Sequence, residues 1–137
     1  MKNRLINFTI VSLFAILIIS CSEDNTVENT YNDASISIGQ NNNSVGIAVT
    51  ASNAKAATQT APIIFTGDSV FVNYSVIGYG GGAAYITLSN DEMESETFSL
   101  NSGQNIGNRP LSFKPATVFV DIKEGYTGII AMAITGK

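Results

Sequence analysis

The sequence comprises 137 residues, with 7 basic and 11 acidic side chains, 45% hydrophobic residues, and neither histidine nor tryptophan. The absence of histidine and the presence of only one cysteine, Cys21, exclude Ser-His-Asp and Cys-His nucleophiles, zinc sites built on histidine or cysteine, and haem ligation by those residues. An enzyme built from this chain would therefore be restricted to carboxylate, lysine or tyrosine chemistry.

The first twenty residues have the layout of a secretory signal. Lys2 and Arg4 supply a positive start, and positions 5–19 are apolar apart from three polar residues. This run is shorter than the about 20 apolar residues that a transmembrane helix needs. Two other interpretations stay open here. One is a membrane helix that is never cut, and the other is an ordinary cleaved signal, which would leave an unpaired thiol in an oxidising compartment.

The apolar run ends in Ile18-Ile19-Ser20-Cys21, where a branched apolar residue and a small residue precede the cysteine. This segment resembles the lipobox of bacterial lipoproteins. The resemblance implies cleavage before Cys21, a diacylglycerol on its sulfur, and acylation by chains such as palmitate. Each buried CH2 of such a chain contributes about 0.8 kcal/mol, and two or more chains hold a protein firmly on a membrane. Cys21 is therefore the expected lipidation site.

The segment Ser22-Glu23-Asp24 is similar to the acidic export tag of Bacteroidetes lipoproteins that reach the outer face of the outer membrane. It has only two acids before Asn25, and a merely solvated acidic tether is the alternative explanation. The resemblance implies a lipid-anchored protein of the outer membrane, with the cell surface favoured over the periplasmic face.

After the signal, 117 residues remain, with five basic against eleven acidic side chains. A net charge near −6 is unsuited to phosphate backbones, so no nucleic-acid partner is expected. Positions 21–33 are polar and acidic, which predicts a flexible tether, and positions 34–137 form one domain of ordinary size.

From Ala34 onward, apolar residues alternate with small or polar ones, which is the period of a β-strand. The two alternating runs that predict a first hairpin, around a polar turn at positions 40–43, contain Ile36 and Ile38 and then Val45, Ile47 and Val49. Positions 52–60 predict a loop or a single helical turn. Ile63-Ile64-Phe65 predicts a short strand entered by Pro62.

The second half continues the same pattern. Further strands are predicted at 69–77, over Ala84, Ile86 and Leu88, around Phe98 and Leu100, around Leu111 and Phe113, at 117–123 and at 129–135. Segment 78–82 is expected to end the strand at 69–77. Segment 101–108 is expected to form a loop and segment 124–128 a hairpin turn. The last strand is apolar on both faces, which indicates a central strand or one covered on both sides. Eight or nine short strands predict an all-β antiparallel sandwich, either immunoglobulin-like or jelly-roll.

Three tyrosines on or next to turns are candidate ligand contacts, namely Tyr79, Tyr85 and Tyr126. Exposed tyrosine rings can stack on sugars or anchor a protein partner, because they combine apolar faces with a polar tip. Carbohydrate modules more often use tryptophan, and scattered surface tyrosines are ordinary.

Four acids crowd one loop, namely Asp91, Glu92, Glu94 and Glu96. Calcium prefers several carboxylate and carbonyl oxygens, so these residues are a candidate calcium site, although their spacing is not that of the twelve-residue calcium loop. Solvated acids that deter edge pairing are the alternative, and a glycosidase pair among them is a further one. No other cofactor is expected.

Two short motifs have ordinary explanations. The Gly78–Gly82 segment is glycine-rich like a phosphate-binding loop, but a strand follows it where such loops require a helix, so a turn is expected. Asp68-Ser69-Val70 resembles the O-glycosylation acceptor of Bacteroidetes, which makes Ser69 a candidate glycosylation site.

These observations predict a lipid-anchored envelope lipoprotein that is not an enzyme and that binds an extracellular glycan or envelope protein through loops. The alternative is a structural or assembly subunit of the envelope whose edge strands pair with neighbours. A small carboxylate-dependent hydrolase using Glu92 or Glu94 is the third hypothesis.

Overall fold

A computed structural model describes residues 30–103 and 106–137, and these fold into nine β-strands. The strands are β1 (Ser35–Asn41), β2 (Ser44–Ala51), β3 (Ala57–Pro62), β4 (Val70–Gly81), β5 (Ala84–Ser89), β6 (Ser95–Ser99), β7 (Ile106–Pro110), β8 (Thr117–Ile122) and β9 (Thr127–Gly136). The lipobox with Cys21, the acidic tag and most of the expected tether lie outside the described residues. In the part that is described, no helix has the length and apolar character needed to traverse a bilayer.

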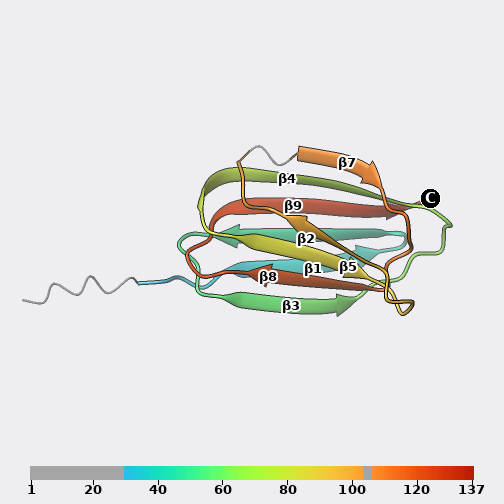
Figure 1. Cartoon of the computed structure of the whole chain (residues 1–137), viewed down its shortest axis with the longest axis horizontal. Helices are drawn as coiled ribbons and strands as arrows, with labels where there is room; N and C mark the ends of the chain where they lie inside the picture. Colours follow the sequence, from blue (N-terminus) through green and yellow to red (C-terminus); the bar gives the residue numbers. More distant parts are fainter. Residues whose placement is uncertain (1–29, 104–105) are drawn as a thin grey trace, which may run out of the picture.

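The strands form two antiparallel sheets packed face to face (Figure 1). One sheet has five strands in the order β1-β2-β9-β4-β7, and the other has four in the order β3-β8-β5-β6. Strand β2 pairs with β9, β3 with β8, β4 with β7 and β5 with β6. The chain from β2 to β9 is thus folded back on itself at the β5–β6 connection and wound into two sheets, which is a jelly roll. This confirms the predicted sandwich and selects one of its two expected topologies.

The core lies between the sheets and is built by alternation along each strand. The inward residues of β2, β9, β5 and β8 include Val45, Ile47, Val49, Ile130, Met132, Ile134, Ala84, Ile86, Leu88, Val118, Val120 and Ile122, and all are buried. No polar or charged residue is buried among the described residues, apart from the hydroxyl of Tyr126. Burial of apolar surface is therefore what holds the two sheets together.

Several predicted elements are confirmed. β1 and β2 form the first hairpin around Asn42 and Asn43, and Asn42 has a φ of 50°, which turns the chain. β9 lies between β2 and β4, as its apolar faces indicated. The expected tether is shorter than predicted, because Asn32 already bridges to Ala54 and its amide donates to Asn53 O at 2.9 Å.

The prediction for positions 52–65 was wrong in two places. The segment expected to be a loop or a helical turn contains β3, which pairs along its whole length with β8. Ile63-Ile64-Phe65 is not a strand: Ile63 and Phe65 are buried in the core, and the amide of Ile63 donates to Ala116 O at 2.8 Å. The residues of β3 are small or polar, so they show no apolar alternation from which a strand could be predicted. The pairing of β3 with β8 is set instead by tertiary contacts.

Three connections also differ from expectation. β4 continues to Gly81 through a register shift after Ile77, since glycine tolerates the φ of 63° at Gly78. Segment 124–128 is not a hairpin turn, because β8 and β9 belong to different sheets. The expected loop at 101–108 contains the start of β7, while Leu111 and Phe113 are buried in a connection and not in a strand.

Candidate functional site

The outward surface of the five-stranded sheet, here called the five-strand face, is made mostly of small uncharged residues, with four larger apolar side chains among them, and Lys137 Nζ lies 4.4 Å from the ring centroid of Phe71 at its margin. Its residues are Ser35, Ser37, Gly39 and Asn41 from β1, Ser44, Gly46, Ala48 and Thr50 from β2, Ile129, Ala131, Ala133 and Thr135 from β9, Phe71, Asn73, Ser75 and Ile77 from β4, and Ile106, Asn108 and Pro110 from β7. They face outward because successive strand residues alternate and their neighbours fill the core. No charge lies at any of these positions.

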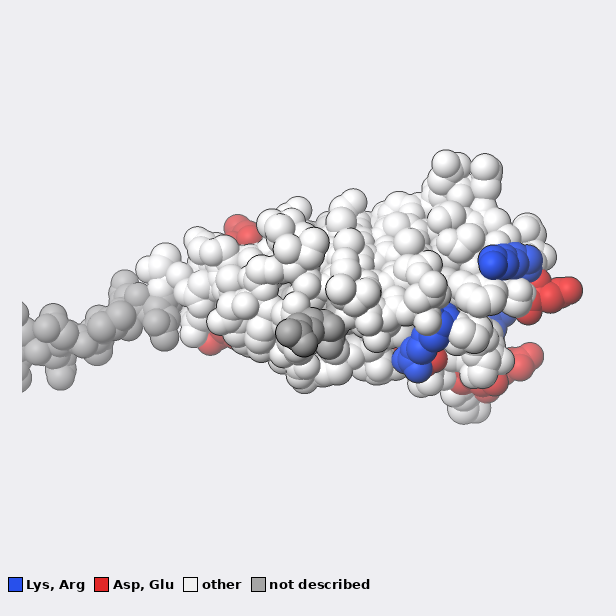
Figure 2. Space-filling view, turned by 90° about the horizontal axis from the view of Figure 1, so that it is seen from above, with Lys and Arg blue, Asp and Glu red and all other residues white. Residues whose placement is uncertain are grey.

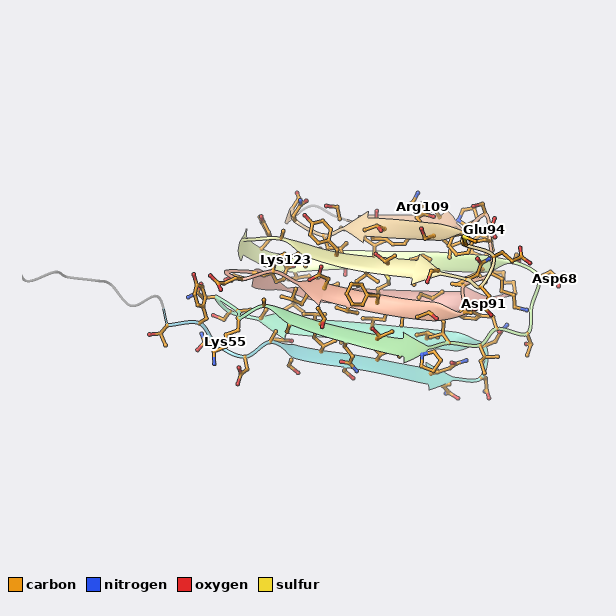
Figure 3. The ribbon with its side chains drawn as sticks, turned by 60° about the horizontal axis from the view of Figure 1, so that its bottom comes forward. Lys55, Asp68, Asp91, Glu94, Arg109 and Lys123 are labelled. Carbon is orange, nitrogen blue, oxygen red and sulfur yellow. The ribbon has the colours of Figure 1, made fainter. Side chains whose placement is uncertain are left out.

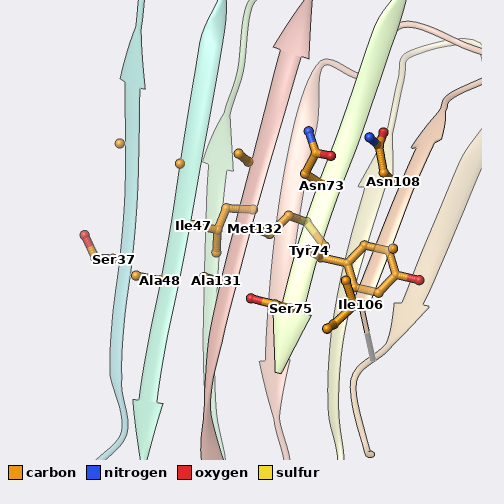
Figure 4. A pocket seen from close by; sticks show the side chains of 14 residues that line it. Ser37, Ile47, Ala48, Asn73, Tyr74, Ser75, Ile106, Asn108, Ala131 and Met132 are labelled. Carbon is orange, nitrogen blue, oxygen red and sulfur yellow. The ribbon is translucent and has the colours of Figure 1, made fainter. Parts of the chain in front are cut away.

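Strand register arranges these residues in straight lines across the sheet. Ser37, Ala48, Ala131, Ser75 and Ile106 form one line. Gly39, Gly46, Ala133, Asn73 and Asn108 form the next. Figure 4 shows the labelled members of both lines, with the amides of Asn73 and Asn108 next to each other on neighbouring strands.

An open groove of about 680 Å³ runs across these two lines. Glycine, alanine and serine residues form much of its floor, so a ligand can come close to the backbone of the central strands. Ile106 stands at one border with 82% of its surface exposed, and Asn73 and Asn108 offer amide donors and acceptors beside it. The groove can therefore hydrogen-bond and make apolar contact with a ligand without applying any charge to it.

Charged residues lie elsewhere on the sandwich. In Figure 2 most of the visible lysine, arginine and acidic side chains gather at the end where the chain terminates. Figure 3 shows Asp68, Asp91, Glu94 and Arg109 toward this end and Lys55 and Lys123 toward the other. None of the residues that line the groove is charged.

The three candidate tyrosines lie in three different environments. Tyr126 is fully buried, so its expected exposure on a hairpin turn was wrong: its segment crosses between the sheets and packs the ring into the core. Tyr79 is half-buried, and its hydroxyl donates to Gly82 O at 2.9 Å. Tyr85 is half-exposed on the outward surface of the other sheet, where Phe119 on β8 is 38% exposed. Tyr79 and Tyr85 are therefore both partly exposed, and Tyr79 packs against the core.

The hydroxyl of Tyr126 has no hydrogen-bond partner among the described residues. Burial raises its pKa above the ordinary value, and the nearby Tyr79 raises it further. This group is enclosed in the core, so we assign it no ligand.

Among the described residues, the four loop acids do not form a group that could hold a metal ion. Asn90 Oδ1 accepts the amides of Glu92 and Glu94, each at 3.0 Å, and Asn90 Nδ2 donates to Glu94 Oε2 at 2.7 Å. Glu96 instead forms an ion pair with Arg109 on β7. Within residues 30–103 and 106–137, no three acidic, histidine or cysteine side chains gather in a group that could hold a metal ion. Asp91, Glu92 and Glu94 line a separate hollow of about 490 Å³ with Lys114.

Ser69 is exposed just before β4, and its carbonyl accepts the amide of Lys137 at 2.8 Å. The side chain is thus accessible, as a modification site must be.

The five-strand face was missed by sequence reasoning. Its one sequence signal was the small residues that alternate with core residues in β2 and β9, and this signal does not say which strands are neighbours.

Comparison with known proteins gives no family. No protein-family model matches the chain, and no curated protein matches it. Among solved structures, it is similar to a chain described under Bacillus endospore appendages that form disulfide-linked pili, with 18% identity, a TM-score of 0.42, and coverage of 80% of this chain and 94% of that one. It is also similar to a chain described as CBM4, with 12% identity, a TM-score of 0.31, and coverage of 76% and 78%. A third is the enzymatically active domain of tailspike protein 4 from bacteriophage CBA120, with 12% identity, a TM-score of 0.40, and coverage of 77% of this chain and 18% of that one.

Proposed function

We propose that this chain is a non-catalytic, lipid-anchored protein of the outer membrane whose jelly roll binds a neutral glycan outside the cell. The observation that carries the ligand-binding part is the uncharged groove on the five-strand face. The anchor at Cys21 and display at the cell surface are supported by the resemblance of the N-terminal segment to lipoproteins. The binding site is thus assigned to a sheet face instead of the loops.

The chemistry of the groove favours a neutral glycan. Asn73, Asn108, Ser37 and Ser75 offer both donors and acceptors, which match the hydroxyl groups of a sugar. Ala48, Ala131 and Ile106 offer apolar contacts for its C–H faces. An anionic polymer would find no cation at these positions, so its charges would lose water without compensation.

A binding role is also favoured over catalysis by the chain's composition and by the contacts of its acids. The chain has no histidine. Glu94 is held by Asn90 within its own turn and Glu96 by Arg109, so these carboxylates already have structural partners. We propose that no metal is needed, and glycan binding should therefore be the same with and without a chelator.

The test uses Ser22–Lys137 on an array of neutral and anionic glycans. Ala131 is exposed in the middle of the groove, and Ala131→Arg should lower affinity for the bound glycan at least about tenfold, because a long charged side chain then fills the site. Thr60→Arg places the same side chain on the outward surface of the other sheet and is the matched control. The proposal fails if no neutral glycan binds above background, or if both variants lose binding equally. Tyr85→Ala tests whether the tyrosine on the outward surface of the other sheet contributes to glycan binding, and it should leave binding unchanged.

A second candidate function is that of a structural or assembly subunit of the envelope. It is favoured by the edge strand β1, which carries no charge and has β2 as its only neighbour in the described sheet. Crosslinking in whole cells would count against it if only monomer were recovered.

A further inference from the structure

The two sheets have four edge strands, and three of them carry residues that oppose pairing with another strand. β3 ends in Pro62, which lacks an amide donor. β6 contains Glu96, and β7 contains Arg109 followed by Pro110. Charges and prolines at edges are the usual protection against pairing between molecules.

β1 has no such protection. Its sequence, Ser-Ile-Ser-Ile-Gly-Gln-Asn, contains no charge and no proline. It pairs with β2 in unbroken register over all seven residues, so it contains no bulge. Every second residue of β1 directs its amide and carbonyl away from β2, because hydrogen-bonded and non-hydrogen-bonded positions alternate in an antiparallel pair. In residues 30–103 and 106–137, no strand occupies that other side.

The side chains of β1 also indicate a missing neighbour. Ile36 and Ile38 point toward the core but are only half-buried, because the sheet ends beside them. Ser35, Ser37 and Gly39 are exposed on the five-strand face. Farther along, the side chain of Gln40 bonds to the backbone of Ile64, so the open stretch of the edge is Ser35–Gly39.

We infer that β1 is a dimerisation edge that pairs antiparallel with β1 of a second copy of this chain. The open stretch is self-complementary about Ser37. When Ser37 faces Ser37 of the partner subunit, Ile36 faces Ile38 of the partner subunit twice, and small residues face each other on the outer surface. One pairing therefore covers both unprotected edges and all four half-buried isoleucines. A strand of a different protein that paired with β1 would cover the edge of one copy only.

The pairing joins the two five-stranded sheets into one ten-stranded sheet. The two-fold axis runs perpendicular to the sheet, so both five-strand faces lie on the same side of the dimer. Figure 4 shows Ser37 on the strand next to Ala48, at the border of the groove, so the dimer would place two grooves side by side. This inference does not depend on the lipid anchor or on the glycan.

The test measures the mass of the full chain in mild detergent by native mass spectrometry. The wild type should be a dimer, and Ser37→Lys should be a monomer, because it sets two like charges opposite each other at the two-fold axis. Thr58→Lys introduces the same charge at an exposed position of β3, and it should remain a dimer. A monomeric wild type, or equal behaviour of the two lysine variants, would overturn the inference.

Single cysteines test the register in native membranes. A residue facing its own copy at a non-hydrogen-bonded position has a Cα separation of about 4.5 Å, which a disulfide can span. Ser37→Cys should give a disulfide-linked dimer on mild oxidation, and Thr58→Cys should not. Crosslinking of Thr58→Cys as efficient as that of Ser37→Cys would show random collision and contradict the pairing.

Discussion

The ring of Tyr79 lies against the ring of Tyr126, with centroids 6.1 Å apart and planes at 53°. Tyr79 belongs to β4 and Tyr126 to the β8–β9 connection, so the contact links the end of one strand to a crossing between the sheets. The backbone of Tyr126 is fixed as well, because its carbonyl accepts the amide of Ala54 at 3.0 Å. The ring is thus held in the core while its hydroxyl has no partner among the described residues.

Replacing Tyr126 by phenylalanine should raise the free energy of unfolding by about 1 kcal/mol. A buried polar group without a hydrogen bond costs about 1–3 kcal/mol, and phenylalanine keeps the ring while removing that group. Urea unfolding of Tyr126→Phe measures the change, with Tyr79→Phe as the control that removes a satisfied hydroxyl. A loss of stability in Tyr126→Phe would show that the hydroxyl is hydrogen-bonded.

The same hydroxyl predicts a pH dependence at high pH. Its pKa is raised in the folded protein above the ordinary value of about 10, so the folded state holds the proton more tightly than the unfolded state. This contribution to stability is fully present below about pH 10 and is lost as pH rises through the folded pKa. Above about pH 10, the wild type should therefore lose stability faster than Tyr126→Phe. Parallel curves for the two proteins would contradict the assignment.

Arg109 should stabilise the edge where β7 of one sheet approaches β6 of the other. Its guanidinium pairs with Glu96 and lies 4.9 Å from the ring centroid of Phe98. Arg109→Ala should lower the free energy of unfolding by about 1 kcal/mol, since a partly exposed ion pair contributes about 0.2–1 kcal/mol and a cation–π contact about 0.5–1 kcal/mol.

Lys55→Ala is the control for Arg109→Ala, because Lys55 forms an exposed ion pair with Asp33 at 3.5 Å and contacts no aromatic ring within the described part of the chain. It should change stability by less than about 0.5 kcal/mol. Equal losses in the two variants would show that the contact with Phe98 adds nothing.

The strands with one buried face could be predicted from the sequence, because burial leaves a period of two. This holds for Val45, Ile47 and Val49 in β2 and for Val118, Val120 and Ile122 in β8. β3 could not be predicted in this way, since its residues are small and its place at an edge is set by pairing with β8. The buried residues Ile63 and Phe65 have strand-like composition but follow Pro62 into a connection.

The connections and the candidate site depended on long-range pairing. Glu124-Gly125-Tyr126 has the residues of a hairpin turn, and only the positions of β8 and β9 in different sheets make it a crossing that buries Tyr126. Likewise Ala48, Ala131 and Ser75 lie far apart in the sequence, and the order β2-β9-β4 brings them into one line. Local patterns predict which residues face outward, but they do not say which outward residues meet.

The central claim is that lipid on Cys21, and no protein contact, holds this chain at the membrane. The direct measurement is fractionation of cells that carry wild type or Cys21→Ser, followed by detection of the chain in membrane and soluble fractions. We predict wild type in the membrane fraction and the serine variant released from it, since we propose that acyl chains on Cys21 supply the membrane affinity. A processed Cys21→Ser protein that remained in the membrane fraction would contradict the claim.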